Sequence, residues 1–377
     1  MYMVEWKKLG DVCSINARIG WQGLTRKEHK KTGDYLLVTG TDFTSNHQVD
    51  FDHCVYVDEI RYTQDTNIQL RANDILITKD GTLGKMAIID KLPKPATLNG
   101  GLFVIRDATG RIHHKFILHY MLSSRFQSII ESNHTNGTIK HLTQALLTNF
   151  PFPIPSLQEQ TRIVGILDTF TDSIENLKQQ IAQRRKQYEH YRDQLLDLEG
   201  KEGVEIKTLP DISVNCDRAR RPITSSKRVS GSYPYYGASG IVDYVDGYIF
   251  DGDYLLISED GANLLARTTP IAFQISGKSW VNNHAHVLQF KEMVTQKFVE
   301  IYLNMINLEP WINGAAQPKL NQDNLNKIEI PIPNLSEQQR IVSILDTFEA
   351  SISNLEAQLE QRQKQYEYYR NKLLTFE

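Results

Sequence analysis

The most constraining feature of this 377-residue chain is an internal repeat. Residues 158–199 recur as residues 336–377, and about 26 of the 42 positions are identical at a constant offset of 178. A fainter repeat opens each half of the chain, because residues 4–12 resemble residues 204–212. Repeats at a fixed offset indicate duplicated structural units. The sequence therefore predicts the order globule, helix, globule, helix, in which the helices are nearly identical and the globules are not.

This contrast favours a single scaffold that carries two different binding modules. Duplication followed by drift is the alternative, although drift alone does not explain why the helices are preserved. The predicted fold class is α+β, with globules at residues 1–152 and 201–330 and helical regions at 153–200 and 331–377. Within the globules, Leu76–Thr78 and Leu255–Ile257 predict buried strands before Asp-Gly turns, and residues 116–130 and 298–305 predict helices.

Each helical repeat carries an apolar stripe at alternating steps of three and four residues, which is typical of a coiled coil. A single helix cannot bury such a stripe, so it needs a partner, and the twin helix in the same chain is the simplest one. Antiparallel pairing is favoured because its twofold axis suits a ligand with twofold symmetry, such as a DNA duplex; parallel pairing and a plain dimerisation coil stay open. The stripes comprise Ile163, Leu167, Phe170, Ile174, Leu177, Ile181, Tyr188, Tyr191, Leu195 and Leu198, then Ile341, Leu345, Phe348, Ile352, Leu355, Leu359, Tyr366, Tyr369, Leu373 and Phe376.

The stripe also predicts a distance. From Ile163 to Leu198 a helix runs roughly 50 Å at about 1.5 Å per residue. One turn of DNA measures about 34–36 Å, so such a rod could hold two globules about one turn apart. Arg184 and Arg362 interrupt the two stripes at the same position, and we expect them to extend their charged ends to solvent or to fix the register rather than to contact DNA.

Composition leaves the function open. The net charge of −3 argues mildly against a nucleic-acid partner, although binding depends on the local field and not on the total charge. The cysteines Cys13, Cys54 and Cys216 are scattered, which predicts neither disulfides nor a zinc site. The sequence shows no signal peptide and no stretch apolar enough to span a bilayer, so a reducing cytoplasm is the expected location.

Basic and aromatic residues cluster where loops are expected. Such residues supply phosphate contacts, while Arg, Lys, Asn and Gln that reach base edges give sequence choice; a solvated loop surface is the alternative for any single residue. The candidates in the first globule are Arg18, Trp21, Arg26, Lys27, Lys30, Lys31, Lys79, Thr82 and Lys85, and those in the second are Arg218, Arg220, Arg221, Lys227, Arg228, Tyr236, Asn282, Asn283 and His284.

The start of each helical repeat carries polar groups that we expect to be exposed and to form a protein docking edge. An ordinary solvated first turn, with glutamate placed favourably against the helix dipole, explains them equally well. The candidate docking residues are Glu159, Gln160 and Arg162, and Glu337, Gln338 and Arg340.

The sequence shows no catalytic motif. Ser276–Ser279 resembles the end of a phosphate-binding loop, but Ala272 stands where that loop requires glycine. We find no Asn/Asp-Pro-Pro-aromatic run, no GxGxxG after a strand, and no partners that would make His284 and His286 a metal site.

The proline-rich entry to each helix carries a family resemblance. Residues 330–342, IPIPNLSEQQRIV, and their twin at 152–164, FPIPSLQEQTRIV, resemble the signature of type I restriction–modification specificity subunits. Tyr233–Ile241 is similar to a segment near the start of one class of target-recognition domain, whereas the first globule has Tyr35–Asp42 instead, which indicates a different subtype. The resemblance covers essentially the whole chain.

The resemblance implies two target-recognition domains separated by two helices in an antiparallel intramolecular coiled coil. Each domain would read one half of an asymmetric bipartite site in double-stranded DNA. The helices would dock two modification subunits, which supply S-adenosylmethionine and adenine methylation, and restriction subunits with ATP and Mg²⁺ would join them. The chain itself would bind no cofactor. The alternatives are a diverged methyltransferase or nuclease with a fused recognition region, and a coiled-coil adaptor without a DNA role.

Overall fold

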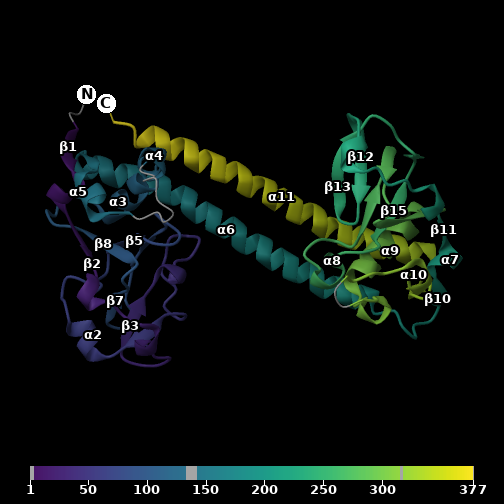
Figure 1. Ribbon diagram of the computed structural model, residues 1–377, viewed down its shortest axis with the longest axis horizontal. Coiled ribbons are helices and arrows are strands. Elements are labelled where there is room, and N and C mark those ends of the chain that lie inside the picture. Colours follow the sequence, from purple (N-terminus) through teal and green to yellow (C-terminus); the bar gives the residue numbers. More distant parts are fainter. Residues whose placement is uncertain (1–3, 133–141, 315–316, 377) are drawn as a thin grey trace. The chain divides into compact units, whose positions relative to one another are not determined.

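The computed structural model describes residues 4–132, 142–314 and 317–376, and the side chain of Trp21 lies outside this description. The chain forms two compact units: unit 1 combines Met1–Gln180 with Leu355–Glu377, and unit 2 is Ile181–Asn354. Each unit holds one globule and part of both long helices, α6 (Leu157–Leu196) and α11 (Leu335–Leu373) (Figure 1). Among the described residues, no helix is long and apolar enough to cross a membrane.

Unit 1 is built on two main sheets. The first has the strand order β2-β8-β5-β6 and is antiparallel, and the second has the order β4-β3-β7, in which β3 and β7 are parallel. The strands are β1 (Glu5–Lys8), β2 (Cys13–Ala17), β3 (Tyr35–Val38), β4 (Val55–Val57), β5 (Ile75–Thr78), β6 (Met86–Ile88), β7 (Ala96–Leu98), β8 (Leu102–Asp107) and β9 (Pro151–Ile154), and the globule's helices are α1 (Leu9–Val12), α2 (Glu59–Thr63), α3 (His114–Met121), α4 (Ser124–Ser132) and α5 (Gln144–Asn149).

Unit 2 has the same plan. An antiparallel sheet has the order β11-β18-β15-β16, and a second sheet has the order β13-β12-β17-β14, in which β12 and β17 are parallel. The strands are β10 (Glu205–Thr208), β11 (Ser213–Asn215), β12 (Ser230–Gly237), β13 (Gly240–Val245), β14 (Phe250–Asp251), β15 (Tyr254–Ser258), β16 (Ala272–Ile275), β17 (Lys278–Val281), β18 (Ala285–Phe290) and β19 (Glu329–Ile332), and the globule's helices are α7 (Leu209–Ile212), α8 (Asn263–Ala266), α9 (Met293–Met305) and α10 (Gln322–Leu325).

The two dissimilar segments singled out in the sequence occupy the same place in the fold. Val38 of β3 pairs in parallel with Leu98 of β7, and Tyr236 of β12 pairs in parallel with Val281 of β17. Both strands therefore hold the same position in equivalent sheets. The difference in sequence leaves the pairing of this strand with its two neighbours unchanged, although the sheet of unit 2 has one further strand, β14.

The opening repeat of each half pairs as a strand with the proline-rich segment that precedes the long repeat. In unit 1, β1 from the opening repeat pairs antiparallel with β9, the proline-rich entry to α6. In unit 2, β10 pairs with β19 in the same way before α11. Each pair forms a separate two-stranded sheet, where a proline without a backbone N–H is tolerated. This short sheet ties the first residues of each globule to the start of a long helix.

The structure confirms both predicted strands, as β5 and β15, and changes the predicted helices. The segment at 116–130 forms two helices, α3 and α4, because the chain turns at Ser123, whose backbone N–H and side-chain hydroxyl both donate to the carbonyl of Tyr120. In unit 2, α9 begins at Met293, five residues before the predicted start at Phe298. The long helices end at Leu196 and Leu373, so the last stripe residue of each lies beyond its helix.

In each unit the globule and the long helices share a hydrophobic core. In unit 1, Ile163 and Leu167 of α6 are buried in the same cluster as Phe116 of α3 and Leu374 at the end of α11. In unit 2, Ile341 and Leu345 of α11 are buried with Phe298 of α9 and Leu196 of α6. The first turns of one long helix and the last turns of the other therefore belong to each globule.

The long helices run antiparallel in both units (Figure 1). In unit 1, Phe170 stacks on Tyr369 with 5.4 Å between ring centroids, and further along α6 the side chain of Leu177 lies in a groove with Gln358. In unit 2, Tyr191 stacks on Phe348 at 5.3 Å. This confirms the favoured antiparallel intramolecular pairing. The distance that the helices set between the globules stays a prediction.

The two interrupting arginines lie against aromatic rings. The guanidinium of Arg362 lies 5.6 Å from the ring centroid of Phe170 in unit 1, and that of Arg184 lies 5.6 Å from Phe348 in unit 2. A cation over an aromatic face adds a favourable contact that fits only one alignment of the helices. Their placement within the helix pair agrees with a role in register.

Candidate nucleic-acid interface

Three loops meet at one edge of each globule, and we call this the loop edge. In unit 1 it comprises residues 39–42, 79–84 and 99–101, which follow β3, follow β5 and connect β7 to β8. In unit 2 it comprises residues 238–239, 259–262 and 282–284 at the equivalent places. Loops carried by a rigid sheet are a common location for binding residues.

The same backbone hydrogen bonds hold both loop edges. The N–H of Lys79 donates to the carbonyl of Gly101 at 2.9 Å, and the N–H of Glu259 donates to His284 at 2.9 Å. The N–H of Asn99 donates to Val38 at 2.9 Å, and that of Asn282 donates to Tyr236 at 3.0 Å. Eight residues thus occupy four pairs of equivalent backbone positions, and the side chains are unrelated in every pair except Asn99 and Asn282.

In unit 2 the loop edge also includes the adjoining arginine segment, residues 218–221, and Tyr236 at the end of β12. It then contains most of the residues predicted for that globule. The N–H of Arg221 donates to Val281 at 3.2 Å, and the indole of Trp280 donates to the carbonyl of Arg221 at 2.6 Å, so the arginine segment lies along β17. Lys227 is exposed in a separate turn, Ser225–Lys227, which is not one of these loops. The predicted residues brought together here are Arg218, Arg220, Arg221, Tyr236, Asn282, Asn283 and His284.

These residues differ in what they can offer to a ligand. Arg218, Arg221, Asn283 and His284 are exposed, and an imidazole nitrogen of His284 lies 2.8 Å from the carboxylate of Asp260. Asn282 is buried, and its side-chain carbonyl accepts the N–H of His284 at 2.8 Å, so it shapes the loop. Tyr236 is half-buried, and burial raises the pKa of its hydroxyl.

Arg220 was predicted to contact DNA, but its guanidinium is bound within the protein. The side chain is only 14% exposed and donates to Glu259 at 2.6 Å and to the carbonyl of Ala285 at 2.8 Å. A guanidinium placed in a fixed geometry with these acceptors stabilises the protein's own loops. Arg228 likewise bonds within the unit, to Asp243 at 3.3 Å, and lies over the ring of Tyr235.

The expectation for Arg18 is also wrong. Its side chain is 3% exposed and donates to the carbonyls of Leu98 and Gln22 at 3.0 and 3.1 Å and to Gln64 at 2.9 Å. Burial lowers the pKa of its guanidinium, and the nearby charge of Arg61 acts in the same direction. Arg18 therefore joins internal segments of unit 1 and has no free face for a phosphate.

The other candidates of unit 1 are more accessible. Arg26 and Lys27 are exposed in a short turn, Arg26–Glu28, and Thr82 is exposed at the loop edge. Lys79 lies 5.2 Å from the ring centroid of Phe103, and Lys85 donates to the carbonyl of Phe43 at 2.6 Å, so both are partly held by the protein. The side chain of Trp21 lies outside the described part of the chain, Lys30 is paired with Asp58, and Lys31 is exposed.

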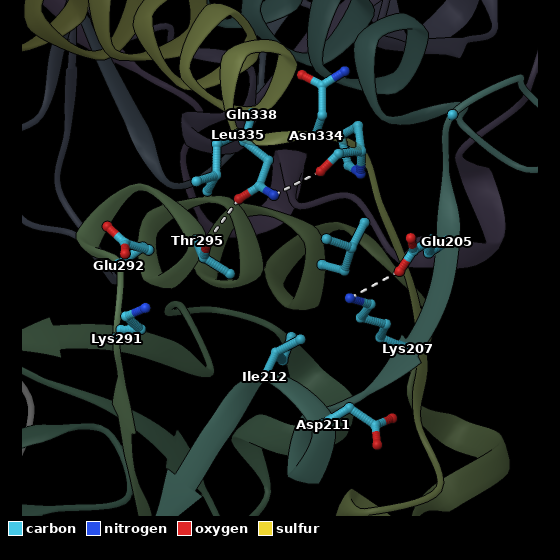
Figure 2. Close-up of a pocket in the computed structure, with 13 residues that line it drawn as sticks. Glu205, Lys207, Asp211, Ile212, Lys291, Glu292, Thr295, Asn334, Leu335 and Gln338 are labelled. Carbon is cyan, nitrogen blue, oxygen red and sulfur yellow. Dashed lines mark hydrogen bonds and ion pairs between the residues drawn. The ribbon is translucent and has the colours of Figure 1, made fainter.

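The structure overturns the expected exposure of the two glutamines at the helix starts. Gln160 is fully buried: its amide donates to the carbonyl of Pro155 at 2.9 Å, and its side-chain carbonyl accepts the N–H of His113 at 2.8 Å. Gln338 is also buried and bonds the carbonyl of Pro333 at 2.7 Å and the hydroxyl of Thr295 at 2.8 Å (Figure 2). Each glutamine fastens a long helix to its globule.

Of the other docking candidates, the two arginines are exposed and the two glutamates are partly exposed, and all four form ion pairs. Arg162 forms a bidentate ion pair with Glu159, with distances of 2.6 and 2.8 Å, and Arg340 forms one with Glu337, with distances of 2.7 and 2.8 Å. Beside them lies an exposed leucine in each unit, which sequence reasoning missed. We call these residues the helix-start surfaces: Leu157 (49% exposed), Glu159 and Arg162 in unit 1, and Leu335 (51% exposed), Glu337 and Arg340 in unit 2.

A groove of about 410 Å³ adjoins the helix-start surface of unit 2 (Figure 2). Its walls carry both charge signs, including Lys207, which is paired with Glu205 at 2.8 Å, and Asp211. At the matching place in unit 1, Lys7 pairs with Glu5 at 2.9 Å in the same way, and Arg111 adds a second ion pair to Glu5 at 2.9 Å. The two helix starts are therefore alike in their exposed residues and in this ion pair, and they differ in the contact from Arg111.

Comparison with known proteins identifies the family. The family described as "Type I restriction modification DNA specificity domain" matches residues 3–184 and again residues 201–363. The chain belongs to this family. The two matches cover both globules and much of both long helices of the specificity protein.

Relatives of this specificity protein agree. A candidate type I restriction enzyme specificity subunit of Haemophilus influenzae is 45% identical over 188 residues, which is 48% of each chain. The match thus spans about half the length of that relative. A type I restriction enzyme specificity subunit of Escherichia coli is 30% identical over 293 residues, which cover 69% of this chain and 70% of that one.

Solved structures share the fold of this specificity protein. The crystal structure of a type I restriction–modification S subunit from M. genitalium aligns with 100% of this chain and 97% of its own, with a TM-score of 0.64 and 16% identity. A chain from a structural study of the assembly and conformational transition of the type I restriction–modification system aligns with 98% of this chain and 96% of its own, with a TM-score of 0.59 and 15% identity.

Sequence reasoning missed one loop of this specificity protein. Asn99–Gly101 of unit 1 holds the place that Asn282–His284 holds in unit 2. A signal was present, because both segments have an asparagine three residues before the apolar strand that follows. The two glycines lack side chains, and a search for basic and polar residues therefore passed over them.

Proposed function

We propose that the chain is the sequence-specificity subunit of a type I restriction–modification complex and that each globule reads one half of an asymmetric, bipartite DNA site. The observation that carries the proposal is the pair of loop edges, in which equivalent backbone positions hold unrelated side chains. A fixed frame with exchangeable loops would present two different recognition surfaces. Membership of the specificity family supports DNA as the ligand.

The exposed side chains of the loop edges suit this role. In unit 2, Arg218 and Arg221 would contact phosphates, and Asn283 and His284 would reach base edges. In unit 1, Thr82 and the half-buried Lys79 flank the glycine loop, whose bare backbone would allow close approach of DNA. Contacts to phosphates position a protein, while hydrogen bonds to base edges carry the sequence information.

The helix-start surfaces would dock two modification subunits, one in each unit. Their exposed leucine, glutamate and arginine occur twice in the same arrangement, so a partner that binds one surface has a second site of the same chemistry. Interfaces typically combine such an apolar residue with a rim of charged groups. Restriction subunits would join this core in the cytoplasm.

The chemistry of the complex would then come from its partners. Modification subunits would bring S-adenosylmethionine, restriction subunits would bring ATP and Mg²⁺, and this chain would supply recognition alone. The competing proposal, a diverged methyltransferase, requires that the purified chain transfer a methyl group to DNA in the presence of S-adenosylmethionine without any partner. Transfer by the chain alone would decide for that alternative.

The direct test is to express the chain with its modification subunit in a host that lacks DNA methylation and to map the methylated adenines. The proposal expects one asymmetric motif, split into two short parts by an unread spacer. Methylation that depends on the chain but follows a single continuous motif would contradict the two-reader proposal. Methylation that is unchanged when the globules are exchanged for those of another family member would favour a coiled-coil adaptor.

A further inference from the structure

A cluster of charged side chains lies beneath the loop edge of unit 2. Asp217 accepts a hydrogen bond from the N–H of Val287 at 2.7 Å and pairs with His286 at 2.6 Å and Arg220 at 3.2 Å. Arg220 also pairs with Glu259 at 2.6 Å. This charged cluster joins the arginine segment, the turn after β15 and the start of β18 into one connected block, and Arg220 also donates to the carbonyl of Asn283, in the loop before β18, at 3.5 Å.

The charged cluster reaches a fourth segment through two further contacts. Lys319 pairs with Glu259 at 3.1 Å, and the second ring nitrogen of His286 lies 2.8 Å from the carbonyl of Leu320. Both ring nitrogens of His286 thus face oxygen atoms of other segments. The cluster is buried, with 1% exposure for the His286 side chain and 12% for Glu259.

Asp217, Glu259 and His286 have the composition of a metal site, with ligand atoms within 4.8 Å of one another. Their positive partners are protein groups, however. Arg220 and Lys319 neutralise Glu259, while Arg220 and His286 face Asp217. Burial raises the pKa of both carboxyls, but the hydrogen bonds from His286 and Arg220 outweigh it and leave the pKa of each lowered. A metal ion would have to displace these cations.

Unit 1 has different residue types at the positions equivalent to the charged cluster. Thr78 pairs with Leu102 and Ser258 pairs with Ala285, so Phe103 of β8 corresponds to His286 of β18. Phe103 pairs with Ala17, and Lys79 stands where unit 2 has Glu259. The charged cluster is therefore specific to unit 2 and is not required by the shared fold.

We propose that Glu259 and Arg220 are positioning residues that fix the DNA-reading loops of unit 2 and do not themselves contact DNA. The inference rests on the proposed DNA-reading function. A buried ion pair that loses one partner leaves the other charge uncompensated, so the loops rearrange. Arg221, one residue further along, donates from one guanidinium nitrogen to the carbonyls of Arg218 and Arg220 at 2.8 and 2.7 Å, but it is exposed and can still contact a phosphate.

The direction in which one substitution changes DNA affinity distinguishes a positioning role from a purely electrostatic one. Glu259→Gln keeps the size of the side chain and removes one negative charge near the DNA surface. A purely electrostatic role for Glu259 predicts tighter DNA binding, because a repelling charge is gone. The positioning role predicts weaker binding, because Arg220 keeps only Asp217 of its two carboxylate partners and Asn283 and His284 lose their placement.

The experiment uses the full chain with its modification subunit and duplexes carrying the mapped site. Affinity is measured for the intact site, for single base changes in each half-site, and as a function of salt. We expect Glu259→Gln and Arg220→Gln to weaken specific binding about tenfold and to reduce discrimination only in the half-site read by unit 2, with the salt slope unchanged. The matched control Glu329→Gln removes an exposed acid from β19 and should leave both half-sites discriminated as before.

Two outcomes would overturn the proposal. Tighter binding by Glu259→Gln, or a salt slope lowered by about one unit for Arg220→Gln with sharp discrimination retained, would make these residues electrostatic or phosphate-contacting groups. If Arg220→Gln fails to fold, Glu259→Gln and Arg220→Lys carry the test, since both keep a hydrogen-bonding group in place. Failure of the wild-type complex to select a split site would instead reject the proposed function itself.

Discussion

Phe170 of α6 stacks on Tyr369 of α11. Phe348 of α11, which corresponds to Phe170 at the repeat offset of 178, stacks on Tyr191 of α6, which corresponds to Tyr369. The same pair of residue types thus meets once in each unit with the helix roles exchanged. The arginine over each phenylalanine, Arg362 in unit 1 and Arg184 in unit 2, repeats the relationship. The contacts of one unit are therefore reproduced in the other with the two helices exchanged.

This symmetry predicts matched losses of stability. Phe170→Ala and Phe348→Ala each remove an aromatic stack and a cation–π contact from a half-buried site, which should cost about 1–2 kcal/mol. The two losses should agree to within about 0.5 kcal/mol. Denaturant unfolding followed by circular dichroism measures both. A large loss for one variant and none for the other would show that the helix pair is not equivalent in the two units.

The buried glutamines predict a structural role at the helix starts. Gln160→Ala leaves the N–H of His113 and the carbonyl of Pro155 without their partner, which should destabilise unit 1 by about 1–3 kcal/mol. The neighbouring Glu159→Ala removes only an exposed ion pair and should cost less than about 1 kcal/mol. Thermal unfolding of both variants compares them. Equal stabilities would mean that the glutamine does not anchor the helix.

Two aspartates at equivalent positions of the long helices predict opposite pH effects. Burial raises the pKa of Asp168, but hydrogen bonds from His119 and Lys115 outweigh it, and its pKa lies below the ordinary 3.8. The ionised Asp168 therefore stabilises the fold above about pH 3.8, and this contribution is lost as the pH falls through the folded pKa. Asp168→Asn should be less stable than wild type at pH 7, and the difference should shrink in acid.

Asp346 provides the matched control for this prediction. Asp346 is exposed on α11, and the partial loss of solvent around its carboxyl together with the charge of Glu349 raises its pKa, which the charge of Lys297 only partly offsets. Its stabilising contribution is present when it is protonated and is lost as the pH rises through the folded pKa. Asp346→Asn should therefore be at least as stable as wild type at pH 7. Unfolding of both variants between pH 3 and pH 7 measures the signs, and equal destabilisation at neutral pH would contradict them.

The exposed arginines of the loop edge predict a change in salt dependence. Arg218→Gln and Arg221→Gln should each weaken DNA binding and lower the slope of log affinity against log salt by about 0.9, because each releases one fewer counterion. Fluorescence anisotropy over a range of salt concentrations measures the slope. Affinity and slope that match wild type would place this segment outside the DNA interface.

The sequence allowed the helix pair to be predicted because the heptad stripe is a property of local spacing. Steps of three and four residues place Phe170 and Tyr369 on apolar faces, and the repeat supplies a partner in the same chain. The antiparallel choice depended on a symmetry argument, and the stacked rings confirm it. The burial of Gln160 could not be predicted, because its side chain bonds to His113 on a separate segment and the periodicity of a helix does not reveal such contacts.

The loop edges show a second limit of sequence reasoning. Basic residues were found by composition, but exposure depends on which acids the fold brings near them. Glu259 lies 39 residues from Arg220 and removes that arginine from the surface, while Arg221 remains exposed. Arg18 likewise finds its acceptors at Leu98 and Gln64, far along the chain.

The central claim is that each globule reads its own half of the DNA site independently of the other. It is tested most directly by replacing residues 201–330 with the corresponding globule of another family member and mapping adenine methylation by the resulting complex. The account predicts that one half of the split motif changes while the other half and the spacer stay as in wild type. A motif in which both halves change, or in which neither does, would contradict it.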